Sequence, residues 1–226
     1  MSDPQIAARA RELLMESADP DKAPAMARYM KTEMPFYGVT SQPRKVISRQ
    51  LVREFPVTSR VEYERAVRAL WRGTYREEKY LAIAYARSFP RYVTLSSISM
   101  YQMMIAQGAW WDFVDEIAVH LVGSVLSNQR DKLTPVMEAW AVSTDMWLRR
   151  TSILCQLGHK VDTDTSLLDL TCTRNLDSTE FFIRKAIGWS LREYAKTNPA
   201  WVLRYVSQHE DEMSGLTHRE ATKHLR

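Results

Sequence analysis

Apolar residues recur at intervals of three and four along almost the whole chain, and no other feature constrains the fold as much. The pattern is clearest in 80–89 (YLAIAYARSF), 134–143 (TPVMEAWAVS) and 181–195 (FFIRKAIGWSLREYA). This spacing places apolar side chains on one face of an α-helix. The chain has only 7 glycines and no Asn-Gly or Asp-Gly pair that would indicate a β-hairpin. With prolines such as Pro135 separating the segments, the pattern predicts an all-α protein of about a dozen helices.

A 35-residue offset runs through this helical pattern. Gly38, Gly73 and Gly108 are 35 residues apart, and so are Gly123 and Gly158. The segment 143–157 (STDMWLRRTSILCQL) also aligns with 178–191 (STEFFIRKAIGWSL) at this offset, and in both we expect Ser-Thr-acid to form an N-cap and an acidic first turn. Seven glycines can produce such intervals by chance, but the second alignment weakens that explanation. The offset predicts a right-handed superhelical solenoid of HEAT-like repeats, forming one domain over 1–226.

Composition restricts the class of protein further. The hydrophobic and charged fractions, 45% and 26%, are ordinary for a globular chain, and the net charge of +4 permits a polyanionic partner without requiring one. Two cysteines favour a reducing compartment, and without a signal peptide or a membrane-length apolar run we expect a soluble protein of the cytoplasm. There is no Cys/His cluster at zinc spacing and no P-loop, GxGxxG or GxSxG motif, so we expect neither a metal nor a cofactor.

The same offset relates several chemically distinctive residues. Asp115, Arg150 and Lys185 are 35 residues apart, Trp111 precedes Asp115 by one helical turn, and Trp189 follows Lys185 by one turn. Equivalent positions of stacked repeats lie along one surface, so these five side chains are expected to line a single channel. The alternative for Asp115 is an ion pair with Arg150 that holds adjacent repeats together.

A surface of this composition would suit nucleic acid. Arg and Lys bind phosphate oxygens, and indoles contact sugar and base faces. The alternative for each basic residue is a solvated helix face. The remaining tryptophans, Trp71, Trp110, Trp140, Trp147 and Trp201, are expected to pack in the core or between helices. The residues that we expect to contact DNA are Arg44, Lys45, Arg149, Arg184, Lys185, Arg192, Lys196 and Arg219.

Over nearly its whole length the chain resembles the AlkD-like family of DNA alkylation repair glycosylases. The resemblance rests on 25–39 (AMARYMKTEMPFYGV), 110–117 (WWDFVDEI), 147–157 (WLRRTSILCQL), 180–199 (EFFIRKAIGWSLREYAKTNP) and 219–225 (REATKHL). It implies a stack of HEAT-like repeats that wraps duplex DNA. It also implies excision of positively charged alkylated purines, chiefly 7-alkylguanine and 3-methyladenine.

The resemblance also assigns roles to residues. It implies that Asp115 is the catalytic aspartate, Trp111 and Trp189 face the lesion, Arg150 is the active-site arginine and Tyr29 supports the site. In 38–45 (GVTSQPRK) the proline is displaced by one residue from the family's pattern, which changes a loop that would contact DNA. The family's last helix is expected to be cut short here, since the chain ends at residue 226.

The expected function is that of a monomeric, monofunctional glycosylase acting in base excision repair, without cofactor or lyase activity. A cationic purine is already a good leaving group, so the enzyme needs a carboxylate to stabilise the cationic sugar and to orient water, but no general acid. Two other functions are compatible with the sequence: a non-catalytic protein that binds DNA structures on the same scaffold, and a HEAT-type protein-interaction scaffold.

Overall fold

The computed structural model describes residues 3–225, with side chains from Gln5 onward, and this part of the chain is α-helical without a β-strand. The predicted all-α class is therefore confirmed. The chain divides into two compact units, residues 1–93 and 94–226, and each is described separately below. Within residues 3–225, no helix is both long and apolar enough to cross a membrane.

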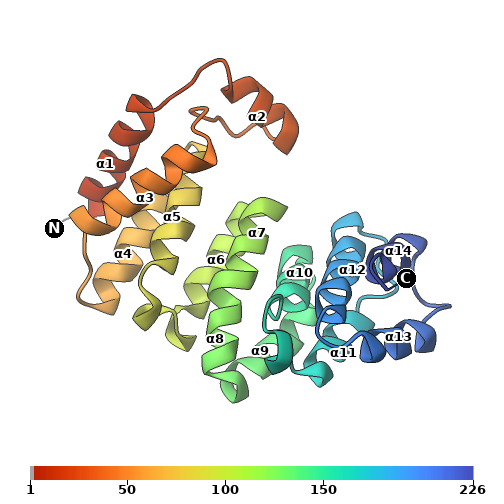
Figure 1. Cartoon of the computed structure of the whole chain (residues 1–226). Coiled ribbons are helices and arrows are strands. Elements are labelled where there is room, and N and C mark those ends of the chain that lie inside the picture. The colour runs from red at the N-terminus through yellow and green to blue at the C-terminus, as the bar shows by residue number, and fades with distance from the viewer. Residues whose placement is uncertain (1–2, 226) are drawn as a thin grey trace. The chain divides into compact units, whose positions relative to one another are not determined.

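The first unit packs four of its helices around one core. Helix α1 contacts α3, α4 and α5, and α5 also contacts α3 and α4 (Figure 1). Its largest fully buried side chains include Tyr63, Trp71 and Tyr85. Helix α4 begins with a capping box in which Ser59 and Glu62 each accept a backbone N–H of the other. The helices are α1 (Asp3–Glu16), α2 (Ala23–Met30), α3 (Ser41–Glu54), α4 (Arg60–Trp71) and α5 (Arg76–Arg87), followed by a 3₁₀ turn, Pro90–Tyr92.

The segment that leads into α3 is held by a buried carboxylate. Glu77 on α5 accepts the backbone N–H groups of Tyr37, Gly38 and Val39 at 3.1, 2.9 and 3.0 Å. Gly38 has φ +84°, and a Cβ there would lie 2.0 Å from the carbonyl oxygen of Asp19. Only glycine fits this position, so the path of the chain into α3 is well defined.

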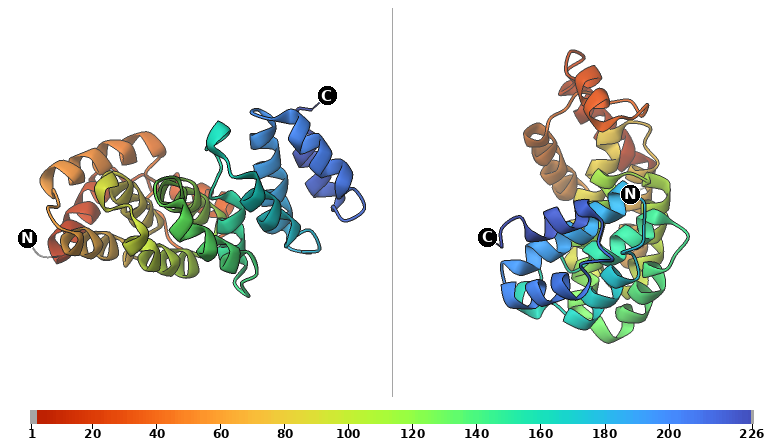
Figure 2. Two further views of the ribbon diagram at one scale, coloured as in Figure 1. Left: turned by 90° about the horizontal axis from the view of Figure 1, so that it is seen from below. Right: turned by 90° about the vertical axis from the view of Figure 1, so that its right-hand side faces the viewer.

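The second unit has two layers of helices. In one layer α7 contacts α10, α10 contacts α12, and α12 contacts α14; in the other α9 contacts α11, and α13 packs against α12 and α14 (Figures 1 and 2). A π-helical segment, Ala118–Val122, joins α7 to α8 without a break. The helices are α6 (Ile98–Gly108), α7 (Trp111–Ile117), α8 (Gly123–Asn128), α9 (Arg130–Ala141), α10 (Met146–Leu154), α11 (Thr165–Thr173), α12 (Phe181–Ala195), α13 (Pro199–Gln208) and α14 (Gly215–Thr222), with 3₁₀ turns at Leu95–Ser97 and Lys160–Asp162.

Helix boundaries agree with the apolar spacing except where polar residues start a helix. Helix α12 spans the predicted 181–195, whereas α5 and α9 begin four residues before the apolar segments predicted for them. The prediction that Pro135 separates helices is wrong, because α9 already begins at Arg130, where the Gln129 carbonyl accepts the N–H groups of Lys132 and Leu133. Pro135 therefore removes one backbone N–H from inside the helix.

The two Ser-Thr-acid segments are equivalent, but their predicted capping residue is wrong. The N-cap of α10 is Asp145, whose carboxylate accepts the N–H of Trp147 at 2.8 Å, while the Ser143 hydroxyl accepts the N–H of Asp145. Likewise, Glu180 is the N-cap of α12, and the Ser178 hydroxyl accepts its N–H. The serine thus shapes the turn before the helix, and the acid occupies the cap.

The glycines at the same offset are not equivalent. Gly123 lies inside a continuous helix, whereas Gly158 has φ +94° in a turn. The 35-residue offset is expressed instead in side-chain contacts within the second unit, where Asp115 binds Arg150 and Lys185 binds Glu220. These contacts join α7 to α10 and α12 to α14, the neighbouring helices of one layer.

Candidate functional site

The candidate site begins at the amino-terminal end of α7. Trp111 and Asp115 are four residues apart on this helix and therefore share a face. Phe113, Val114 and Ile117 are fully buried on the other side, whereas Trp111 is only partly buried and the Asp115 side chain remains 14% exposed. Burial of the apolar face thus leaves one indole and one carboxylate at the edge of the core.

Arg150 on α10 binds this carboxylate with both arms of its guanidinium. Its Nε donates to Oδ1 of Asp115 at 2.7 Å and its Nη2 donates to Oδ2 at 2.8 Å, while Nη1 donates to the backbone carbonyl of Phe182 on α12. One side chain, only 5% exposed, therefore joins three helices. The predicted alternative, an ion pair between equivalent positions, is confirmed. Arg150 was expected to line a channel together with Asp115; in the structure its guanidinium is almost fully buried, and all three of its nitrogens donate to protein acceptors.

The environment of Asp115 acts on its ionisation in two opposing ways. Burial raises the pKa of this carboxyl above its ordinary value of 3.8, and the hydrogen bonds and charge of Arg150 oppose that rise. The nearby carboxyls of Asp112 and Glu116 raise the pKa slightly further. The result is a poorly hydrated carboxylate that depends on one guanidinium to remain ionised, and a charge in such surroundings acts more strongly on its neighbours than in water.

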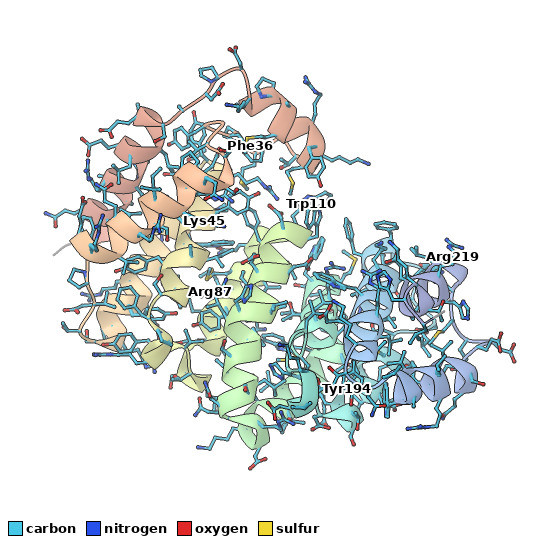
Figure 3. The ribbon with its side chains drawn as sticks, in the orientation of Figure 1. Phe36, Lys45, Arg87, Trp110, Tyr194 and Arg219 are labelled. Carbon is cyan, nitrogen blue, oxygen red and sulfur yellow. The ribbon has the colours of Figure 1, made fainter. Side chains whose placement is uncertain are left out.

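An aromatic cluster lies beside this ion pair. The ring of Trp110, the N-cap residue of α7, lies 6.1 Å from that of Trp147 and 5.4 Å from that of Phe182, and the latter two are 5.1 Å apart. Trp110 stands at the end of α7 (Figure 3). The Phe182 ring centroid is 5.9 Å from the Arg150 guanidinium carbon. These rings help to exclude water from the pair and confirm that Trp110 and Trp147 pack between helices.

The other residues expected at the site are distributed over both units. Trp189 lies on α12, partly buried against the core, one turn after Lys185 and three residues before Arg192. It therefore belongs to the same layer as Trp111, Asp115 and Arg150. Tyr29 lies on α2 of the first unit, with 76% of its surface exposed.

Most basic residues predicted to bind DNA in the second unit already have internal partners. Lys185 Nζ donates to Glu220 at 2.8 Å, Arg192 binds the same carboxylate, and Lys196 Nζ donates to Glu193 at 2.6 Å. Arg149 and Arg184 donate to the backbone carbonyls of residues 143 and 178, and Arg219 is exposed.

In the first unit, Arg44 lies 4.3 Å from the centroid of the Tyr80 ring, and Lys45 is exposed at the start of α3. The Arg44 guanidinium therefore makes a cation–π contact with the Tyr80 ring, whereas the Lys45 side chain is exposed to solvent.

Two functional partners were missed by sequence reasoning. Glu220 could have been found, because it lies 35 residues beyond Lys185 in the register already recognised. The two cations hold the pKa of its carboxyl below the ordinary value, with Lys185 the larger cause. The Phe182 carbonyl had no sequence signal, since every residue has one. Residues 3–225 contain no cluster of three or more His, Cys, Asp or Glu side chains that could hold a metal.

Over residues 3–225 the protein is all-helical, with a largely buried Asp–Arg pair beside an aromatic cluster. The family model for "DNA alkylation repair enzyme" matches residues 10–225, and the chain belongs to this family. A solved structure described as a "predicted DNA alkylation repair enzyme" from Enterococcus faecalis is similar, with a TM-score of 0.85 and 32% identity over 92% of this chain and 97% of that one.

A second solved structure shares the fold at greater distance. It is the alkylpurine DNA glycosylase AlkC of Pseudomonas fluorescens, bound to DNA containing an abasic site analog. The TM-score is 0.53 and the identity 14%, over 100% of this chain and 65% of that chain. No curated protein sequence matches this chain.

Proposed function

We propose that this DNA alkylation repair family member is a monofunctional glycosylase that excises 7-alkylguanine and 3-methyladenine from duplex DNA. One observation carries the proposal above all: the Asp115 carboxylate lies at the edge of the core beside Trp111, held in place by the bidentate guanidinium of Arg150. A preorganised, poorly hydrated carboxylate is suited to stabilising positive charge that develops in a transition state.

The proposed reaction breaks the bond between C1′ of deoxyribose and the alkylated purine. The bonding electrons leave with the base, which becomes neutral, and the sugar becomes an oxocarbenium-like cation. Asp115 stabilises that cation and orients a water molecule whose oxygen bonds to C1′, and the water's proton passes to the carboxylate and then to solvent. Trp111 and Trp189 present indole faces to the cationic sugar and base. The products are the free base and an abasic site.

The contacts of Arg150 and Lys185 support the remaining parts of this mechanism. Arg150 opposes protonation of Asp115, so the carboxylate can be ionised when substrate binds. Lys185 is the amine in the predicted register, and its Nζ is already bound to the Glu220 carboxylate at 2.8 Å. A Schiff base with the sugar is therefore not expected, and neither is lyase activity.

We also propose that the helix pairs are HEAT-like repeats of a solenoid that binds duplex DNA as a monomer in the cytoplasm. Support comes from the 35-residue spacing of the Asp115–Arg150 and Lys185–Glu220 contacts, and from the packing of α7, α10, α12 and α14 in succession. The fold shared with a glycosylase that binds DNA is consistent with this proposal.

The test compares Asp115→Asn with the unaltered chain on a duplex containing one 7-methylguanine. Single-turnover excision should fall by about 10²- to 10³-fold, as when one stabilising group of a transition state is removed. DNA binding should be retained, because asparagine removes a charge that repels phosphate. Glu116→Gln is the matched control: it neutralises the adjacent, exposed carboxylate on the same helix and should retain excision.

Parallel duplexes containing 1,N6-ethenoadenine or uracil, with borohydride added, examine specificity and lyase chemistry. Neither base should be released, and no covalent adduct should form. Normal excision by Asp115→Asn, efficient release of uracil or a trapped adduct would contradict the mechanism. If the unaltered chain binds duplex DNA but releases no 7-methylguanine, it is instead a non-catalytic protein that binds DNA structure.

A further inference from the structure

Helix α3 carries a row of three basic side chains on its solvent-facing side. Lys45, Arg49 and Arg53 are spaced by four residues and therefore lie along one face, and all three are exposed. Ile47 and Leu51 are buried on the opposite face. None of the three basic side chains makes a hydrogen bond or ion pair with any described residue. Like charges at this spacing repel one another and destabilise an isolated helix. The row therefore does not contribute to the stability of α3.

Glu54 follows Arg53 in the sequence. The hydrogen bond from Arg9 is the largest of the causes that hold the pKa of the Glu54 carboxyl below the ordinary value, and the charge of Arg53 is the last; the hydrogen bonds of Glu54 join it to other residues. Glu54 accepts a hydrogen bond from Arg9 of α1 at 3.0 Å and another from Gln50 at 2.7 Å. The excess of positive charge is also a property of the whole first unit. Residues 1–93 contain 17 Lys and Arg against 11 Asp and Glu, a net charge of +6, whereas residues 94–226 contain 14 against 16, a net charge of −2. Long-range attraction of a polyanion therefore comes from the first unit.

The row borders a groove with a mixed lining. Val46, Val52, Arg49 and Arg53 of α3 and Ser88 at the end of α5 enclose a groove of about 530 Å³. Guanidinium groups bind phosphate oxygens with two parallel N–H donors, and valine side chains can contact the carbon atoms of deoxyribose. A free anion would not need the apolar part of this lining, but a sugar–phosphate backbone would use both parts.

The dimensions of the row also suit a nucleic-acid strand. At 1.5 Å per residue, the row from Lys45 to Arg53 extends about 12 Å along α3. A strand of B-DNA has one phosphate per roughly 3.4 Å of duplex axis, so it presents three or four phosphates over that length. Lys45 also continues the 35-residue register of Asp115 and Arg150, two offsets before Asp115.

We propose that this face of α3 binds the phosphodiester backbone of duplex DNA, with Arg49 and Arg53 as its main phosphate-binding residues. The inference rests on the proposed function in one respect, that duplex DNA is the partner of the chain. It assigns the main phosphate contacts to the first unit. In the second unit, Lys185, Arg192 and Lys196 are each paired with a carboxylate of the chain.

The test measures binding of the full chain to an undamaged duplex by fluorescence anisotropy over a series of KCl concentrations. The double variant Arg49→Gln/Arg53→Gln should reduce the slope of log K against log salt by about 1.8, since each phosphate contact contributes about 0.9. If the two contacts act only through counterion release, affinity should fall about 60-fold near 0.1 M salt. Both side chains are exposed, so the thermal unfolding midpoint should stay close to that of the unaltered chain.

The matched control is Arg65→Gln/Arg72→Gln, which removes the same charge from exposed positions associated with α4. Its slope should remain near that of the unaltered chain. Equal loss of slope in both double variants would show that binding follows net charge, and an unchanged slope in Arg49→Gln/Arg53→Gln would overturn the proposal. So would binding to vesicles of anionic lipid that depends on Arg49 and Arg53 while DNA binding does not.

The glycosylase proposal is tested by the excision of 7-methylguanine by the unaltered chain, whereas the role of α3 is tested by the salt dependence of binding to an undamaged duplex. The two proposals can therefore fail separately. Absence of excision by the unaltered chain would contradict the glycosylase proposal, while the salt dependence of duplex binding would still decide the role of α3.

Discussion

Replacing Arg150 with glutamine should reveal how strongly the Asp115 carboxylate depends on its partner. The substitution removes both hydrogen bonds to Asp115 and the charge that balances a carboxylate whose side chain is only 14% exposed. Breaking one side of a buried ion pair costs about 3–5 kcal/mol, because the remaining charge is left uncompensated. For a protein of this size each 1 kcal/mol lowers Tm by about 2–4 °C, so we expect a decrease of roughly 6–20 °C.

The pH dependence of this loss has a definite sign. The folded-state pKa of Asp115 is already raised by burial, and removing Arg150 removes the largest opposing cause. A carboxyl whose pKa is raised on folding favours the folded state below its unfolded value of 3.8, and this contribution is lost as pH rises through the folded pKa. The loss in free energy of unfolding caused by Arg150→Gln should therefore be larger at pH 7.5 than at pH 5.

A double-mutant cycle with Asp115→Asn separates charge balance from packing. Urea unfolding followed by circular dichroism would be measured for both single variants and the double variant at the two pH values, together with single-turnover excision. The double variant should lose less stability than the sum of the singles, by up to about 3 kcal/mol, because neither charge is left alone. It should nevertheless remain inactive. Additive losses, or a deficit independent of pH, would refute the reasoning.

Three further expectations follow from individual contacts in the second unit. Gly123→Ala should cost about 1–3 kcal/mol in urea unfolding, since its Cβ would lie 2.4 Å from the carbonyl oxygen of Cys155, whereas Gly215→Ala, with 3.4 Å to its nearest neighbour, should cost little. Glu220→Gln should lower the free energy of unfolding by roughly 1 kcal/mol or less near pH 7. Because the folded pKa of Glu220 is below 4.5, acid unfolding curves should show this difference disappearing as pH falls through that folded pKa. Burial raises the pKa of the Cys155 and Cys172 thiols to about 12, so mass spectrometry should find neither alkylated by iodoacetamide at pH 8 until the protein is unfolded.

Local patterns in the sequence were sufficient for the helical class and for several elements. The bounds of α12 and the burial of Trp71, Trp140 and Trp147 agree with expectation, because helical periodicity is a property of neighbouring residues and needs no knowledge of the fold. Helix starts were less accurate, since the polar first turn of α5 or α9 has no apolar pattern and depends on backbone partners such as the Gln129 carbonyl.

The 35-residue register predicted that Asp115 and Arg150 lie close together, but only the tertiary structure showed that they form a buried ion pair. Equivalent positions on neighbouring helices are close, yet spacing does not say whether a long side chain turns to solvent or to its neighbour. The packing of α7 against α10 buries the Arg150 guanidinium, and burial then requires all its donors to find acceptors. One of those acceptors is the backbone carbonyl of Phe182, which no side-chain pattern could indicate.

Sequence alone also determined the number of charges but not which of them are free to bind a ligand. Lys185 and Arg192 read as basic residues on one helix face, and the close packing of α14 on α12 places Glu220 between them. On α3, Lys45, Arg49 and Arg53 remain exposed, and none of them forms an ion pair with a carboxylate in the part of the chain that the structure describes. Electrostatic attraction depends on distance in space, so only the folded chain decides which positive charges are cancelled by a carboxylate and which are available to a ligand.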